Sequence, residues 1–278
     1  MRLVVTGARG LLGGPTARYC RDMGANVLST DVSGRPGPGD EVPFLSAELT
    51  DLGQVYDVLH AADAVIHLAA IASQRVYPSA KTFFNNVGAT WNILEASARL
   101  GIKRVVIASS LQVNHTVTPR TPIHYDYFPV DEAHPVSPQE DYSLSKYVGE
   151  TLADGFAHHW GLTVVSIRFP TIFHQQAFET LPFKDLNHGH MALFTYIHVL
   201  DAARACYLAA TVDLPANSHN VLLVSAPDTC IEMPSAEYAR QFFPEAEIRP
   251  GLAKFGSLVN SSKAANLIGF VPEYSLKR

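Results

Sequence analysis

The sequence has little cysteine, and the cysteines that it has form no pattern. Cys20, Cys206 and Cys230 are the three cysteines among 278 residues, an odd number, and none of them forms a C-x-x-C pair. A disulfide framework needs paired cysteines, whereas scattered thiols fit a reducing compartment. We therefore expect a cytoplasmic protein without disulfides.

Long apolar runs and an excess of basic residues are also missing. No apolar run approaches the roughly 18 residues of a membrane span, and the opening segment becomes glycine-rich after too few apolar residues for a signal-peptide core. Lys and Arg number 21 against 26 Asp and Glu, so a net charge of −5 gives no basic surface for nucleic acid or an anionic membrane. We expect neither of these partners.

Clusters of metal ligands are missing too, although the chain has 12 histidines. His158 and His159 would point in different directions on a helix. Neither this pair nor His188-Gly189-His190 has a third and a fourth ligand at a sequence spacing that is typical of metal sites. We predict no metal site. His174, His188 and His190 lie where we expect the chain to face a substrate, so one of them is a candidate to bind a carboxylate or a hydroxyl.

The most informative pattern that is present lies in the first 31 residues. The apolar run Leu3-Val4-Val5 leads into Thr6-Gly7-Ala8-Arg9-Gly10-Leu11-Leu12-Gly13, and a helix-length segment separates it from Val27-Leu28-Ser29-Thr30-Asp31. This order predicts a strand, a glycine turn, a helix and a second strand. Glycines let a pyrophosphate approach the backbone N–H groups at the positive end of the helix dipole. The segment is therefore typical of dinucleotide binding.

Asp31 favours NAD over NADP as the dinucleotide. A carboxylate at the end of the second strand accepts hydrogen bonds from both ribose hydroxyls, whereas a 2′-phosphate about 4 Å away would be repelled by roughly 1 to 4 kcal/mol. Arg9 and Arg35 are close enough in sequence to offset a phosphate charge. We favour the alternative that both are solvated surface arginines.

The rest of the chain predicts an α/β fold, a doubly wound parallel (Rossmann) sheet with a smaller, interleaved C-terminal lobe that binds the substrate. Residues 1–169, with about 196–226, would form the Rossmann domain, and residues 170–195 and 227–278 the small lobe. This prediction rests on the alternation of strands and helices. Apolar, strand-like runs are separated by amphipathic segments of helical character and lie at Leu3 to Thr6, Val27 to Thr30, Ala64 to Leu68, Arg104 to Ala108 and Leu162 to Ile167. Beyond Phe169, Ile197 to Thr211 is expected to be a helix, and His219 to Ser225 one more strand that could join the sheet.

A second constellation carries the chemistry. Tyr142 and Lys146 are four residues apart and so share one helix face, and Ser110 ends the strand that begins at Arg104. Ligands of an open parallel sheet bind beyond the carboxyl ends of its strands, where the serine and the tyrosine would meet. A tyrosine that acts as a base needs its phenolate stabilised, which the Lys146 ammonium is placed to do. Ser110 would hydrogen-bond a substrate hydroxyl or carbonyl.

With these motifs the chain resembles the extended short-chain dehydrogenase/reductases, also called the NAD-dependent epimerase/dehydratase family. The resemblance covers nearly the whole chain. It includes the Thr6 to Gly13 turn, Asp31, Asp51-Leu52, His67-Leu68-Ala69-Ala70, Asn86-Val87-x-x-Thr90, Leu94-Glu95-Ala96, Ser109-Ser110, Tyr142-x-x-x-Lys146, Arg168 and Tyr196-Ile197-His198-Val199-x-Asp201.

The resemblance implies that Ser110, Tyr142 and Lys146 are catalytic and that Asn86 lies near them. It also implies a homodimer, packed through the helices that carry Tyr142 and Thr90, and carbohydrate substrates. The cofactor contacts that it implies are Gly7, Gly10, Leu11, Leu12, Gly13, Asp31, Asp51, Leu52, Leu68, Ala69, Ala70, Asn86, Ala108, Tyr142, Lys146 and Pro170.

Departures from the family pattern favour a small substrate. The V-Y-G that often follows the serines is Val113-Asn114-His115 here, and Leu111-Gln112 replaces the acidic pair of dehydratases. Met191-Ala192-Leu193 stands where a basic residue is frequent, and only 28 positions separate Arg168 from Tyr196, which is short for an enzyme that holds a nucleotide diphosphate. The pattern is similar to that of compact members such as uronate dehydrogenases.

We therefore expect an NAD-dependent oxidoreductase that transfers a hydride from a sugar or sugar-acid hydroxyl to NAD, with candidate substrate contacts Ser110, Gln112, Phe173, His174 and His188. One alternative is a nucleotide-sugar 4-epimerase of the UDP-hexose type, and another is a non-catalytic NAD-binding redox sensor. The proline-rich segment from Asn114 to Glu140 is either a cover over the substrate or a rigid excursion.

Overall fold

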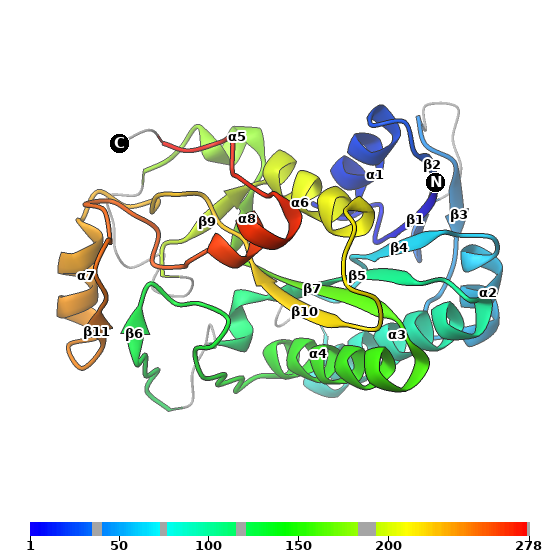
Figure 1. Ribbon diagram of the computed structural model, residues 1–278, viewed down its shortest axis with the longest axis horizontal. Helices are drawn as coiled ribbons and strands as arrows, with labels where there is room; N and C mark the ends of the chain where they lie inside the picture. Colours follow the sequence, from blue (N-terminus) through cyan, green and yellow to red (C-terminus); the bar gives the residue numbers. More distant parts are fainter. Residues whose placement is uncertain (35–40, 73–76, 115–120, 183–192, 277–278) are drawn as a thin grey trace.

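A seven-stranded parallel sheet forms the centre of the protein, for which we describe a computed structural model (Figure 1). The structure describes residues 1–34, 41–72, 77–114, 121–182 and 193–276. From one edge of the sheet to the other, the strands are β10 (His219–Leu223), β7 (Thr163–Phe169), β5 (Arg104–Ser110), β4 (Ala64–His67), β1 (Arg2–Thr6), β2 (Asn26–Asp31) and β3 (Phe44–Ser46). The order reverses direction between β1 and β4, so the crevice for a ligand lies at the carboxyl ends of these two strands.

Helices cover both faces of this sheet, which confirms the predicted doubly wound fold (Figure 1). Successive residues of a strand point to opposite faces, and accordingly Leu3 and Val5 belong to one core cluster while Val4 belongs to the other. This is why the strands are apolar throughout rather than alternating. One face packs on α1 (Gly13–Asp22), α6 (Val199–Thr211) and α8 (Ser262–Ile268), and the other on α2 (Leu52–Leu59), α3 (Ser79–Leu100) and α4 (Asp141–Trp160).

A third core cluster lies beyond the carboxyl end of the sheet. It is surrounded by two small parallel pairs, β8 (Thr171–Phe173) with β9 (Tyr196–His198) and β6 (Tyr127–Phe128) with β11 (Glu247–Ile248), and by η1 (Leu111–Val113), α5 (Gln175–Phe178) and α7 (Ser235–Phe242). The predicted division into two lobes stays a prediction. The cluster also contains Tyr125 and Phe128, which come from the segment that the prediction gave to the Rossmann domain.

Tyr125 and Phe128 also bear on the segment from Asn114 to Glu140. Both are almost completely buried, and the backbone of Val130 bonds to Leu258. The described part of the segment, residues 121–140, is therefore packed into the protein, which favours the rigid alternative over a movable cover.

The main sheet and the helix after β9 each differ in one detail from the expectation. The edge strand β3 was not predicted, since it is three residues long and two of them are exposed. The helix predicted from Ile197 begins at Val199, because Tyr196, Ile197 and His198 pair with β8 before the His198 ring caps the helix. His219 to Leu223 joins the main sheet beside β7, as expected.

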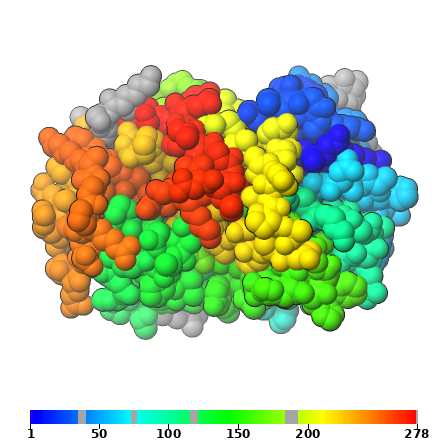
Figure 2. All heavy atoms as spheres, viewed as in Figure 1, coloured from blue at the N-terminus to red at the C-terminus, as the bar shows by residue number. Residues whose placement is uncertain are grey.

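The C-terminal segment lies against α6 (Figure 2). The Asp201 carboxylate, at the start of α6, accepts the backbone N–H groups of Glu273 and Tyr274 at 2.9–3.0 Å. Among the described residues, no helix combines the length and the apolar character needed to span a membrane.

Candidate functional site

The glycine turn connects β1 to α1 and leaves no space for a side chain at Gly7 or Gly13. Gly7 has a φ of +71°, which favours glycine, and a Cβ on it would lie 2.7 Å from the Ala69 nitrogen. A Cβ on Gly13 would lie 2.0 Å from the Gly7 carbonyl oxygen. Leu12, at the N-cap of α1, provides no side-chain cap, so the helix N-terminus is open to the cavity that it lines. This geometry suits an anionic group over the turn.

Two cavities meet at this turn. The first has a volume of about 560 Å³ and extends to Ser110 and Tyr142. The second has a volume of about 300 Å³ and extends to Asp31. Four residues line both cavities, namely Gly7, Gly10, Leu68 and Ala70. The two cavities therefore adjoin across the glycine turn, an arrangement that suits an elongated ligand such as a dinucleotide.

Asp31 lies at the end of β2 and lines the second cavity. Its Oδ2 accepts the backbone N–H of Arg9 at 3.0 Å, and its Oδ1 accepts that of Ser33 at 3.2 Å. The Arg9 guanidinium lies over the Phe44 ring, with Cζ 4.2 Å from the ring centroid. Arg35 falls outside the described residues. The carboxylate is thus held by the backbone while still facing the cavity.

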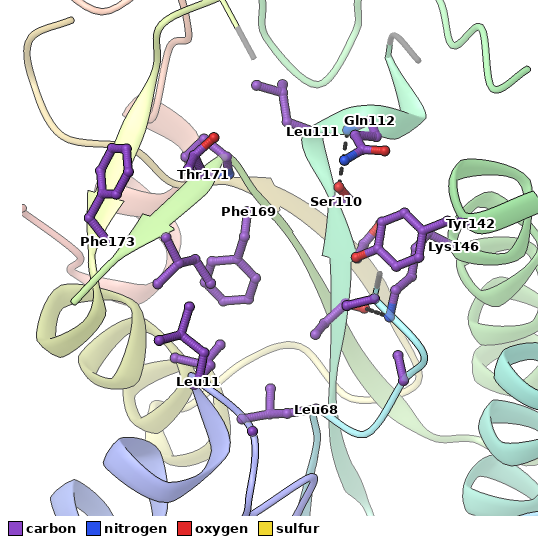
Figure 3. A pocket seen from close by; sticks show the side chains of 18 of the residues that line it. Leu11, Leu68, Ser110, Leu111, Gln112, Tyr142, Lys146, Phe169, Thr171 and Phe173 are labelled. Carbon is purple, nitrogen blue, oxygen red and sulfur yellow. Dashed lines mark hydrogen bonds between the residues drawn. The ribbon is translucent and has the colours of Figure 1, made fainter. Parts of the chain in front are cut away.

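Ser110, Tyr142 and Lys146 come together on one wall of the first cavity (Figure 3). Ser110 ends β5, and Tyr142 and Lys146 lie one turn apart at the start of α4. The Ser110 hydroxyl donates a hydrogen bond to the Tyr142 phenol and accepts the Gln112 N–H at 3.1 Å. Lys146 Nζ lies 5.6 Å from the centroid of the Tyr142 ring.

Burial sets the ionisation of these groups. It raises the pKa of Tyr142 to about 12, although the hydrogen bond from Ser110 acts in the opposite direction. Burial also lowers the pKa of Lys146 to about 8, while the ammonium donates a 2.8 Å hydrogen bond to the Ala108 carbonyl. The tyrosine is therefore a phenol at neutral pH, and the lysine beside it is still largely protonated.

His67 lies behind this wall as a neutral, buried ring. Burial and the nearby Lys146 charge lower its pKa to about 3. The Thr6 hydroxyl accepts the N–H groups of Leu68 and Ala69 at 3.1 Å, so its own hydrogen is left for His67 Nδ1, 2.9 Å away. His67 Nε2 then carries the ring hydrogen and faces the Thr90 hydroxyl at 3.4 Å. This chain fixes Leu68 and Ala69 beside the glycine turn.

A buried ion pair between Glu150 and Arg168 lies next to the segment that carries Ser110, Tyr142 and Lys146. Glu150 accepts two hydrogen bonds from Arg168, at 2.8 and 2.7 Å, and a third from the Ser109 hydroxyl at 2.6 Å. Arg168 Nη1 donates in addition to Asn114 Oδ1 at 3.2 Å. The pair thus joins α4, β7 and the end of β5. No role was predicted for Glu150, although its place four residues after Lys146 on the same helix face was a usable signal.

Several residues predicted to contact the cofactor or substrate have other roles in the structure. The Asp51 carboxylate caps α2 by accepting the N–H groups of Gly53 and Gln54, and Leu52 begins that helix. Asn86 holds the chain after β4 by bonding to both backbone groups of Ile71. His174 caps α5 through the N–H of Ala177. None of these four lines either cavity in the described part of the chain, and His188 falls outside it.

The other predicted contacts line the two cavities. The first is lined by Gly7, Gly10, Leu11, Leu12, Gly13, Leu68, Ala70, Ala108, Ser110, Gln112, Tyr142, Lys146, Pro170 and Phe173, and the second by Ala69 and Asp31. Sequence reasoning missed Glu48 and Leu49 in the second cavity and Thr171, Phe194, Thr195 and Cys230 in the first. The last three come from segments distant in sequence, and no local pattern marks them.

Comparisons with known proteins agree with this geometry. The sequence model described as the NAD dependent epimerase/dehydratase family matches residues 3–182. The uronate dehydrogenase of Pseudomonas putida is 28% identical over 179 residues, covering 63% of this chain and 62% of that protein. The uronate dehydrogenase of Pseudomonas syringae pv. tomato is 30% identical over 173 residues, covering 62% of this chain and 60% of that protein. The chain thus spans less than two thirds of the length of these relatives.

A solved structure extends the likeness over the whole chain. The protein MoeE5, in complex with UDP-glucose and NAD, superposes with a TM-score of 0.71 at 25% identity, and the match covers 99% of this chain and 95% of that chain.

Proposed function

Since the chain belongs to the NAD-dependent epimerase/dehydratase family, we propose that it is an NAD-dependent dehydrogenase that oxidises a hydroxyl of a sugar or sugar acid, with Tyr142 as the base. One observation carries the proposal. Ser110, Tyr142 and Lys146 line the same cavity as the open N-terminus of α1, so proton transfer and dinucleotide binding meet in one space.

Each of the three side chains has a role that follows from its surroundings. Tyr142 takes the hydroxyl proton of the substrate after its own phenol has ionised, and Ser110 holds the substrate oxygen by a hydrogen bond. Lys146 keeps its positive charge near the phenol and so favours the phenolate. A bound NAD would supply the hydride acceptor for the carbon that carries this hydroxyl. The products are a carbonyl compound, NADH and one proton.

The residues of the two cavities suit NAD. The glycine turn would hold the pyrophosphate, and Asp31 would accept hydrogen bonds from the adenosine ribose. Glu48 and Leu49 line the second cavity with Asp31, and we assign them to the adenine in place of Asp51 and Leu52. Leu11, Leu12, Leu68, Ala69, Ala70, Ala108 and Pro170 remain the proposed apolar and backbone contacts, and Asn86 acts by holding the segment after Ala70.

Turnover tests this function directly. The full chain is mixed with NAD and a panel of aldoses, polyols and uronic acids, and the NADH absorbance is followed over time. We expect steady NADH formation that Tyr142→Phe abolishes. As a matched control, Tyr56→Phe on α2 should turn over normally, since Tyr56 lies outside both cavities. NAD binding without turnover on any sugar would instead support the redox-sensor alternative.

The second candidate is a nucleotide-sugar 4-epimerase. The observation that favours it is the similarity to MoeE5, whose structure contains UDP-glucose and NAD. An epimerase would invert a UDP-hexose without net NADH. Incubation with UDP-glucose or UDP-galactose and analysis of the sugar products distinguishes the two reactions.

The family resemblance and the surface together support a homodimer through α3 and α4. Phe84 and Trp91 are 70% and 46% exposed on α3, and Leu144 and Tyr147 are 41% and 37% exposed on the neighbouring α4. Apolar side chains grouped in this way favour a second copy of the chain as the partner. Light scattering during gel filtration should show a dimer for the parent chain and a monomer for Phe84→Glu. A monomeric parent would refute this assembly.

A further inference from the structure

The walls of the first cavity beyond Ser110 and Tyr142 have a distinct chemistry. Leu111 and Gln112 follow β5 on one side, and Thr171 and Phe173 of β8 lie across the cavity from them (Figure 3). Phe194 and Thr195, just before β9, complete this end. The described residues here therefore present an amide, hydroxyls and apolar surface.

Gln112 offers an acceptor that nothing in the described structure uses. Its Oε1 is buried and has no hydrogen-bond partner among the described groups. A buried acceptor of this kind is costly unless a donor reaches it. A hydroxyl of the substrate is such a donor, whereas a carboxylate has only acceptor oxygens.

The backbone before β9, at the end of the cavity, has an unusual conformation. Leu193 and Phe194 have φ values of +55° and +51°, in the left-handed region that bulky residues avoid. Cys230 stabilises this conformation by donating to the Phe194 carbonyl twice, from its backbone N–H at 2.9 Å and from its thiol at 3.1 Å. Strain of this kind persists where surrounding contacts fix it, and it is often found at binding sites.

From these observations, and resting on the proposed dehydrogenase function, we propose that the substrate is an uncharged sugar, which donates a hydroxyl hydrogen bond to Gln112 and lays its C–H face against Phe173. Among the described residues that line the first cavity, Lys146 is the cation, and it is already bonded to the Ala108 carbonyl beside Tyr142. A carboxylate between Gln112 and Phe173 would have to be desolvated there without a charged partner from the described wall. The relatives named uronate dehydrogenases would differ from this chain in that respect.

Two matched substrate pairs test the proposal: D-galactose with D-galacturonate, and D-glucose with D-glucuronate, which differ only at C6. With the full chain and saturating NAD, we expect kcat/KM for at least one neutral sugar to exceed that of its acid by at least roughly tenfold. Equal or faster oxidation of the acids overturns this inference while upholding the dehydrogenase. Absence of NADH formation with all four sugars, where UDP-hexoses are epimerised, overturns the proposed function and this inference with it.

Two variants test the walls themselves. Gln112→Leu should raise KM for the neutral sugar by roughly tenfold or more at unchanged affinity for NAD, and Gln241→Leu, exposed on α7, should change neither. Thr171→Arg places a cation across the cavity from Gln112 and should shift the ratio of kcat/KM values toward the acid. Thr171→Met, which lengthens the side chain without adding a charge, should not shift it. A KM unaffected by Gln112→Leu, or a ratio unaffected by Thr171→Arg, would place the substrate elsewhere and refute the proposal.

Discussion

Replacing Glu150 with glutamine removes one charge from the buried pair with Arg168 and preserves the shape of the side chain. The parent carboxylate accepts three hydrogen bonds of 2.6–2.8 Å, two of them from the guanidinium. The side chains of Arg168 and Glu150 are only 4% and 6% exposed, so water cannot take over the lost partner. Leaving a buried charge uncompensated costs about 3 to 5 kcal/mol. We expect the free energy of unfolding to fall by that amount.

Urea unfolding followed by circular dichroism measures this loss. Glu237→Gln on α7 is the matched control, because Glu237 is exposed and its replacement should change the free energy of unfolding by less than about 0.5 kcal/mol. The double variant Glu150→Leu with Arg168→Met should lose less than the sum of the two single variants, since neither charge is then left alone. A loss below about 1 kcal/mol in Glu150→Gln would refute the assignment of this pair as a buried, unsolvated contact.

Three further predictions concern other parts of the chain. Gly13→Ala should abolish NAD binding in a fluorescence titration, because its Cβ would lie 2.0 Å from the Gly7 carbonyl oxygen. The control is Gly155→Ala in α4, where a Cβ would meet open space. This variant should bind NAD normally, and its free energy of unfolding should rise by about 0.5 to 1 kcal/mol. Asp201→Asn should cost about 1.5 to 3 kcal/mol and expose the C-terminal segment to limited proteolysis, since the carboxylate accepts the N–H groups of Glu273 and Tyr274; an unchanged digestion pattern would contradict this. Burial lowers the pKa of His67 to about 3, so between about pH 6.5 and 3 this side chain takes up a proton only in the unfolded chain. The free energy of unfolding should therefore fall as the pH is lowered through this range. Urea unfolding at several pH values measures this pH dependence, and His67→Gln should make it weaker.

The parts of the site that the sequence predicted are those set by short-range geometry. The glycine spacing and the strand before it determine the turn, and a separation of four residues places Tyr142 and Lys146 on one helix face. Asp31 could be located because a strand end fixes where its side chain lies. In each case, residues close in sequence carry the whole geometric argument.

Asp51 shows how one local signal can fit two roles. Asp51 follows a short connection and precedes an apolar helix, as expected both of a ligand contact and of a helix N-cap. The structure gives it the cap, and Glu48 and Leu49, three residues earlier, line the cavity instead. Distinguishing the two roles required the position of β3, an edge strand too short to predict.

The substrate end could not be predicted, because it is made by contacts across the chain. Phe194 lines the cavity in an unusual backbone conformation, and Cys230, 36 residues later, bonds to its carbonyl group. Neither residue has a neighbour in sequence that marks it as part of a site. Positions of this kind follow from tertiary packing alone.

Three residues on one face of α4 connect the stability of the protein to its proposed chemistry. Tyr142, Lys146 and Glu150 follow one another at intervals of one helical turn. An unpaired carboxylate at position 150 would attract the Lys146 ammonium and oppose ionisation of the phenol. Arg168 instead neutralises Glu150, and the hydrogen bond of Lys146 goes to the uncharged Ala108 carbonyl. The positive charge of Lys146 is therefore left to act on Tyr142, so the buried ion pair serves the proposed base as well as the fold.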